Sequence, residues 1–135
     1  AALEDRDVAV TLDWFESDPG RASKLPLLHS AVGPATDPNL CRRLRALGAT
    51  LGVTPGPTAE AFRATLESLA AIPFRGRVGF DGIGVAADYL RLDEIPAELS
   101  DAARLTAWLA ANFPVDVARA LGFENARRFV LATIG

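Results

Sequence analysis

The residues of this chain that could carry chemistry are few, and three of them stand where short apolar runs end. They are His29, Thr54 and Asp88. A neutral imidazole is a common metal ligand, and a carboxylate can serve as a general base or as a metal ligand. Because active sites of parallel α/β folds lie at the carboxyl ends of the strands, we expect these three side chains to share one rim.

His29 is the single histidine, and a catalytic zinc usually takes three protein ligands. His29 therefore needs further ligands, or it is a partly buried histidine that is hydrogen-bonded to a backbone carbonyl. Asp13 and Glu16 close the first expected strand and could face the same cleft as His29. Their alternative role is that of ordinary loop residues before the turn at residues 17–20.

Asp88 closes a run of small residues, 84–87, that is too small to fill a core by itself. That smallness indicates close approach by a ligand or by a neighbouring strand. Asp88 is then a general base in a cleft, or else the N-cap of the segment that follows. The glycines at 79, 82 and 84 lack the spacing and the downstream acid of a dinucleotide-binding fingerprint, and the chain contains no P-loop sequence.

Composition excludes several functional classes. The 135 residues are 50% hydrophobic, which suits one domain over residues 1–135, and the net charge of −3 gives no basic footprint for nucleic acid. Cys41 is the only cysteine, so no internal disulfide framework exists. No apolar run approaches the ~20 residues of a membrane helix. We expect a cytoplasmic protein and, because the chain contains no Met and starts at Ala1, a segment that once preceded it.

The apolar pattern predicts alternating strands and helices and hence a parallel sheet. Two architectures accommodate four such units: a small open flavodoxin-like sheet, and the C-terminal half of a (β/α)₈ barrel. The expected strands are 8–12, 25–29, 50–54 and 83–88, and the clearest expected helices are 37–47, 58–69, 101–112, 115–121 and 125–131.

Four segments together resemble the renal (membrane) dipeptidase family of metal-dependent amidohydrolases. Residues 26–30, which end in His-Ser, and the following Asp37–Leu40 resemble a His-Ser strand end and the Asn-containing element after it. Residues 47–53 resemble the next helix end and strand. Residues 78–89 resemble the family's Gly- and Asp-rich segment, and residues 121–128 resemble its closing Gly-x-Asn-x-x-Arg helix.

The resemblance implies the C-terminal half of a (β/α)₈ barrel that hydrolyses dipeptides with zinc. His29 matches a zinc ligand, Asp88 matches the acid that handles the proton of the attacking water, and Asn39 belongs to the substrate-binding element. Glu16 stands near the place of another metal ligand, while Pro38 replaces the family's arginine.

A half-barrel of this kind implies a complementary N-terminal half-barrel chain or a homo-oligomer, with a small peptide as substrate. An open half-barrel would expose strand edges and an apolar face, which proteins normally cover. The alternative function is a catalytically inactive interaction or scaffold domain that derives from such a barrel.

Overall fold

The computed structural model describes residues 5–18, 20–86 and 95–135, and within them the chain forms a small α/β fold around a three-stranded parallel sheet. The strands are β1 (Leu28–Val32), β2 (Thr50–Val53) and β3 (Ile83–Val85), and they lie side by side in chain order. Helices α3 (Pro38–Leu47) and α4 (Ala59–Ala70) connect them. The prediction of a parallel sheet is confirmed, with three strands in the described residues instead of four.

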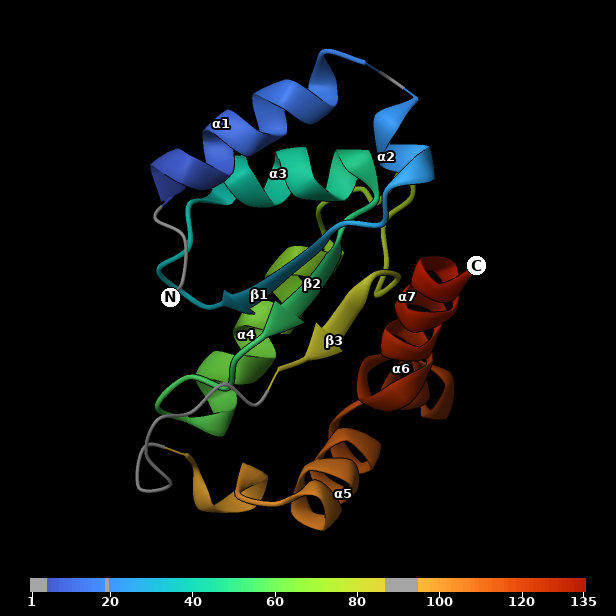
Figure 1. Ribbon diagram of the computed structural model, residues 1–135. Coiled ribbons are helices and arrows are strands. Elements are labelled where there is room, and N and C mark those ends of the chain that lie inside the picture. Colours follow the sequence, from blue (N-terminus) through green and yellow to red (C-terminus); the bar gives the residue numbers. More distant parts are fainter. Residues whose placement is uncertain (1–4, 19, 87–94) are drawn as a thin grey trace.

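The predicted first strand at residues 8–12 is wrong, because this segment lies in helix α1 (Asp5–Glu16). Val8, Leu12 and Phe15 are buried at helical spacing, whereas Val10 is 63% exposed. A strand would have placed Val8, Val10 and Leu12 on one face. The β-branched residues concealed a helical period of apolar positions. In Figure 1, α1 lies on the outer side of α3.

Strand β1 begins three residues later than predicted. The short helix α2 (Arg21–Lys24) precedes it, and Leu25 caps that helix and is 48% exposed. The strand continues to Val32, which is 1% exposed and pairs with Val53. His29 is therefore the second residue of β1 and not its end, which corrects the predicted position of this side chain.

Helix α3 begins and ends at the capping residues of the predicted helix 37–47, Asp37 and Gly48, and α4 begins at Thr58, the start of the predicted helix 58–69. The side chain of Asp37 accepts a hydrogen bond from the backbone N–H of Asn39 at 2.8 Å, and Gly48 ends α3 with φ of 77°. The hydroxyl of Thr58 accepts from the N–H of Ala61 at 3.1 Å at the start of α4.

The core lies between these two helices and one face of the sheet. Leu51 and Ile83, which pair in register, are fully buried, and they belong to one apolar cluster with residues of both helices. The cluster includes Leu40, Leu44, Val53, Phe62 and Leu66. The connecting helices therefore cover the same face of the sheet.

The C-terminal third is helical and lies beside β3 (Figure 1). It consists of η2 (Ala97–Leu99), α5 (Ala102–Asn112), α6 (Val115–Arg119), the π-helical turn η3 (Ala120–Glu124) and α7 (Asn125–Ile134). The sequence predicted that Gly122 ends a helix, and this is wrong because the chain continues through η3 into α7. A Cβ at Gly122 would lie 3.4 Å from Leu109, so this glycine permits close packing against α5. No helix in the described segments is long and apolar enough to cross a membrane.

Candidate functional site

The face of the sheet opposite the core carries small or exposed residues. Leu28 pairs with Thr50, and Gly52 pairs with Gly84, so these four residues point away from Leu51. Leu28 is 54% exposed, and a Cβ at Gly84 would meet no described atom within 4 Å. Gly52 and Gly84 are nevertheless buried, so the described structure leaves this face exposed mainly at Leu28.

A bulge interrupts β1 directly after His29. The register with β2 shifts between His29 and Val32, and Ala31 has a φ of 63°. A non-glycine residue in this left-handed region stores strain, and bulges of this kind often lie beside active sites, where they redirect a side chain. His29 itself pairs with Leu51 and so shares the face of Leu51. It is half-buried and makes an interaction with its surroundings.

Thr54 follows β2 directly, at the carboxyl edge that the sequence predicted. Its backbone N–H donates to the carbonyl of Val32 at 3.0 Å. Its hydroxyl is buried and has no hydrogen-bond partner among the described residues. Buried hydroxyls normally have a partner, so this group has unused capacity at the edge where parallel sheets bind substrates.

Glu16 is held in a surface ion-pair network. It is the last residue of α1, and the guanidinium of Arg43 on α3 donates to both of its carboxylate oxygens at 2.9 and 2.8 Å. Arg43 also bonds Asp13 at 2.5 Å. The hydrogen bond from Arg43 lowers the pKa of Glu16 below its ordinary value, and Glu16 in turn raises the pKa of Arg43. Glu16 is therefore an ionised partner of Arg43.

The remaining predicted site residues lie apart from one another or outside the described residues. Asn39 is an exposed residue in the first turn of α3. Asp88 lies outside the described residues. Among the residues that the structure describes, no group of three or more His, Cys, Asp or Glu side chains could hold a metal ion. These residues do not by themselves fit a zinc site.

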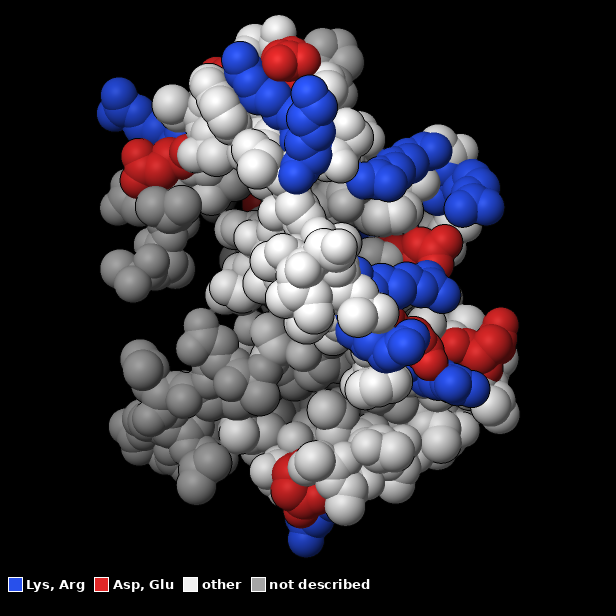
Figure 2. Space-filling view, turned by 45° about the vertical axis from the view of Figure 1, so that its right-hand side comes forward, with Lys and Arg blue, Asp and Glu red and all other residues white. Residues whose placement is uncertain are grey.

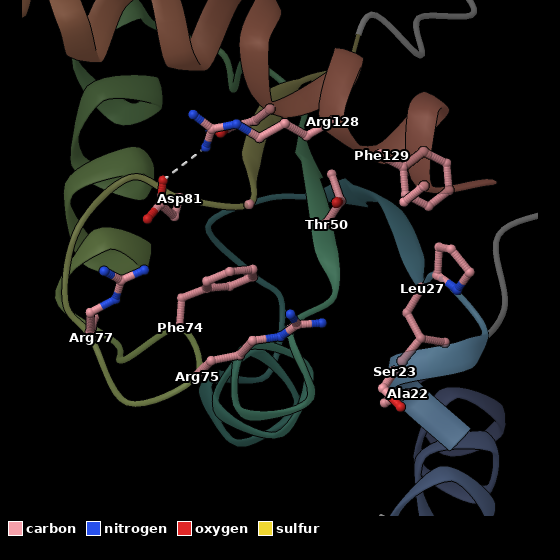
Figure 3. A pocket seen from close by; sticks show the side chains of 15 residues that line it. Ala22, Ser23, Leu27, Thr50, Phe74, Arg75, Arg77, Asp81, Arg128 and Phe129 are labelled. Atoms are coloured by element: carbon pink, nitrogen blue, oxygen red, sulfur yellow. Dashed lines mark hydrogen bonds and ion pairs between the residues drawn. The ribbon is translucent and has the colours of Figure 1, made fainter. Parts of the chain in front are cut away.

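A pocket of about 400 Å³ lies at the opposite edge of the sheet, where the strands begin (Figure 3). Its lining includes Thr50, the first residue of β2, and Asp81 and Gly82, just before β3. Three arginines, Arg75, Arg77 and Arg128, also line it, and sequence reasoning missed it. Arg75, Arg77 and Asp81 lie in one loop, whereas Arg128 comes from α7, far along the chain, and no local motif joins it to them.

The buried Arg45 organises one wall of this pocket. It is fully buried on α3, and its guanidinium donates to the carbonyls of Ile72, Gly79 and Asp81 at 2.7, 2.7 and 2.9 Å. Burial lowers the pKa of Arg45 to about 10, against the opposing attraction of Asp81. This side chain fixes the loop of residues 71–82, which carries Arg75 and Arg77.

Asn125 holds the start of α7 against β3. It is 2% exposed, and its amide nitrogen donates to the carbonyls of Phe80 at 2.8 Å and Ile83 at 2.7 Å. Its amide oxygen is buried, and no donor in the described part of the chain bonds it. One helical turn further on, Arg128 forms an ion pair with Asp81 at 3.2 Å. The closing segment identified in the sequence thus anchors α7 on the loop before β3.

Comparisons of the chain with protein-family models, with curated proteins and with solved structures found no match.

Proposed function

We propose that this chain is part of a (β/α)₈ barrel of the dipeptidase-like hydrolase type, and that it contributes to a peptide-bond-hydrolysing site when complementary strands complete the barrel. The observation that carries the proposal is the sheet itself. Its three parallel strands stand in chain order, and both connecting helices pack on one face. Doubly wound sheets bear helices on both faces, whereas the wall of a barrel bears them on one.

The exposed Leu28 on the second face of the sheet and the edge position of β1 support the proposal that strands from another chain complete the barrel. All-parallel sheets are normally covered on both faces, yet Leu28 on the second face is 54% exposed. β1 is an edge strand of the described sheet, in which it pairs only with β2. Helix α7 also exposes Val130, Leu131 and Ile134. Together these features leave an apolar surface that further strands and helices would bury.

The number of described strands also limits which chain could complete the barrel. An eight-stranded barrel needs five more strands, and two copies of the described sheet would supply only six in total. A complementary chain that supplies the five further strands therefore fits the geometry better than a second copy of this chain.

In the completed site, we assign His29 as one metal-binding imidazole and Asp88 as the acid that takes a proton from the attacking water. The bulge at Ala31 and the hydroxyl of Thr54, which has no partner among the described residues, support a site at the carboxyl edge, whereas His29 lies nearer the start of β1. Because the described residues supply no cluster of three ligands, the other ligands of a zinc ion would come from the complementary half.

A second candidate is a catalytically inactive interaction domain that keeps the barrel scaffold. The same lack of a three-ligand cluster in the described residues favours it. It requires the same complementary surface and predicts no turnover.

Hydrolysis by the assembled protein separates the two functions. The assembly that contains this chain is purified from its native source and assayed for release of free amino acids from dipeptides. Asp88→Asn should lower turnover by about 100- to 10,000-fold, the usual contribution of a general acid or base. The melting temperature should stay unchanged. Asp116→Asn, an exposed acid on α6, is the matched control.

Loss of activity in both His29→Ala and Asp88→Asn, with the control active, is the expected result. An intact assembly that hydrolyses no dipeptide would contradict the hydrolase and support the interaction domain. Activity that survives both substitutions would remove these residues from the site.

A further inference from the structure

The pocket where the strands begin contains cationic groups that the fold does not use. Within the described part of the chain, the guanidinium groups of Arg75 and Arg77 have no carboxylate or carbonyl partner, although both line the pocket. Arg128, by contrast, is paired with Asp81 at 3.2 Å. In the view of Figure 2, Lys and Arg side chains are most numerous along the right-hand side, where Asp and Glu side chains lie among them. Since the whole chain has a net charge of −3, any attraction for anions has to come from such a local group.

Arg75 is held in place before any ligand arrives. A Cβ at Gly48 would lie 2.0 Å from its Nε atom, so the side chain rests directly against the glycine backbone. Its guanidinium carbon also lies 5.7 Å from the centre of the Phe74 ring. A guanidinium that is already ordered loses less conformational entropy when it binds a ligand.

The opposite wall of the pocket is apolar. Figure 3 shows Leu27 and Phe129 on one side, facing Phe74 and the arginines of residues 75–77 on the other, with Thr50 between them. Pro26, Ala22 and Ala132 add to the apolar lining. The volume of about 400 Å³ lies in the range of small-molecule pockets.

Asn125 adds a hydrogen-bond acceptor, its side-chain amide oxygen, to which no described group donates. It lines the same pocket, and both hydrogens of its amide nitrogen are used by the carbonyls of Phe80 and Ile83. The oxygen is therefore assigned by these bonds, and it is buried without a partner in a residue that is 2% exposed. Such an atom calls for a donor that the described residues do not provide.

We propose that this pocket binds a small organic anion, with an apolar body and a carboxylate or phosphate group. Arg75, whose side chain extends between the two walls in Figure 3, binds the charged group in the two-pronged manner that suits both chemistries, and Arg77, beyond the Phe74 ring, adds positive charge. The apolar body lies against Leu27 and Phe129. A hydroxyl or amino group of the ligand, or a water carried with it, donates to Asn125. The site is separate from the proposed hydrolytic edge and does not depend on it.

Titration of the ¹⁵N-labelled chain with phenyl phosphate and with benzoate tests the proposal, with the arginine Nε–H signals as the readout. Both probes should shift the Arg75 signal saturably, and phenol, which lacks the charge, should bind more weakly. Arg75→Gln should weaken binding by about 10- to 100-fold, the effect of losing one hydrogen bond to a charged group, and Arg77→Gln should weaken it by a smaller factor. Arg63→Gln is the control, because Arg63 pairs with Glu67 on α4 and does not line the pocket.

The outcomes separate cleanly. Saturable binding that is weakened in both pocket variants and kept in Arg63→Gln supports the site. Equal affinity in the wild type and in both pocket variants overturns it, as does failure of both probes to bind at millimolar concentration. Circular dichroism of each variant establishes that it is folded, which the exposure of Arg75 and Arg77 leads us to expect.

Discussion

Replacing the buried Arg45 by methionine should destabilise the fold and disorganise the pocket loop together. Arg45 donates to three backbone carbonyls, of Ile72, Gly79 and Asp81, and its side chain is fully shielded from water. Methionine fills similar space but donates no hydrogen bond. The three carbonyls would then lose their charged partner, and any that stay buried would be unsatisfied.

Two opposing effects determine how much Arg45→Met changes the free energy of unfolding. Hydrogen bonds to a charged group contribute about 1.5–3 kcal/mol each, so three of them give roughly 5–9 kcal/mol. Burial of the cation opposes this, because the fall in the pKa of Arg45 to about 10 corresponds to roughly 3 kcal/mol. We therefore expect Arg45→Met to lower the free energy of unfolding by about 2–6 kcal/mol.

Thermal and urea denaturation followed by circular dichroism measure this change. A loss of about 3 kcal/mol should lower the melting temperature by roughly 10 °C in a domain of this size. Arg42→Met is the matched control, because the side chain of Arg42 lies on the same helix α3 but is exposed. This substitution should change the free energy of unfolding by less than about 0.5 kcal/mol. If the two variants melt at the same temperature, Arg45 does not hold the loop and the reasoning fails.

Two further predictions follow from the ion pairs and hydrogen bonds of the fold. Asn125→Ala removes both bonds to Phe80 and Ile83 and should cost about 2–4 kcal/mol in urea denaturation, and a cost near zero would show that α7 is anchored by its apolar contacts alone. The pKa of Glu16 is lowered in the folded state, so its contribution is present above its ordinary pKa of 4.5 and is lost as the pH falls through the lower folded pKa. Glu16→Gln should therefore be less stable than the wild type by about 0.2–1 kcal/mol at pH 7 and equal to it at strongly acidic pH. A difference that does not change with pH would contradict the assignment.

The sequence predicted those elements whose signals are local. Asp37 and Gly48 mark the two ends of α3 through capping chemistry, and they lie where the pattern put them. Val8–Leu12 was misread because β-branched residues favour strands, whereas burial at Val8, Leu12 and Phe15 follows a helical period. Gly122 carries a helix-ending signal that close packing against Leu109 overrides.

For the candidate site, too, the sequence predicted only the features that have a local signal. The sequence placed Thr54 correctly after β2, and its unpartnered hydroxyl became visible only in three dimensions. The contacts of Arg45 with residues 27 to 36 positions away have no local signature. The predicted role of Asp88 stays a prediction, because the residue lies outside the described segments.

The mass of the native species that contains this chain tests the central claim most directly. Light scattering coupled to size-exclusion chromatography, on material from the native source at micromolar concentration, gives that mass. An open three-stranded parallel sheet that is part of a barrel predicts a mass well above the 14.3 kDa of the chain. It also predicts that the amides of β1 exchange slowly with deuterium, because a further strand covers their edge. A monodisperse 14.3 kDa species with rapidly exchanging β1 amides would contradict the barrel.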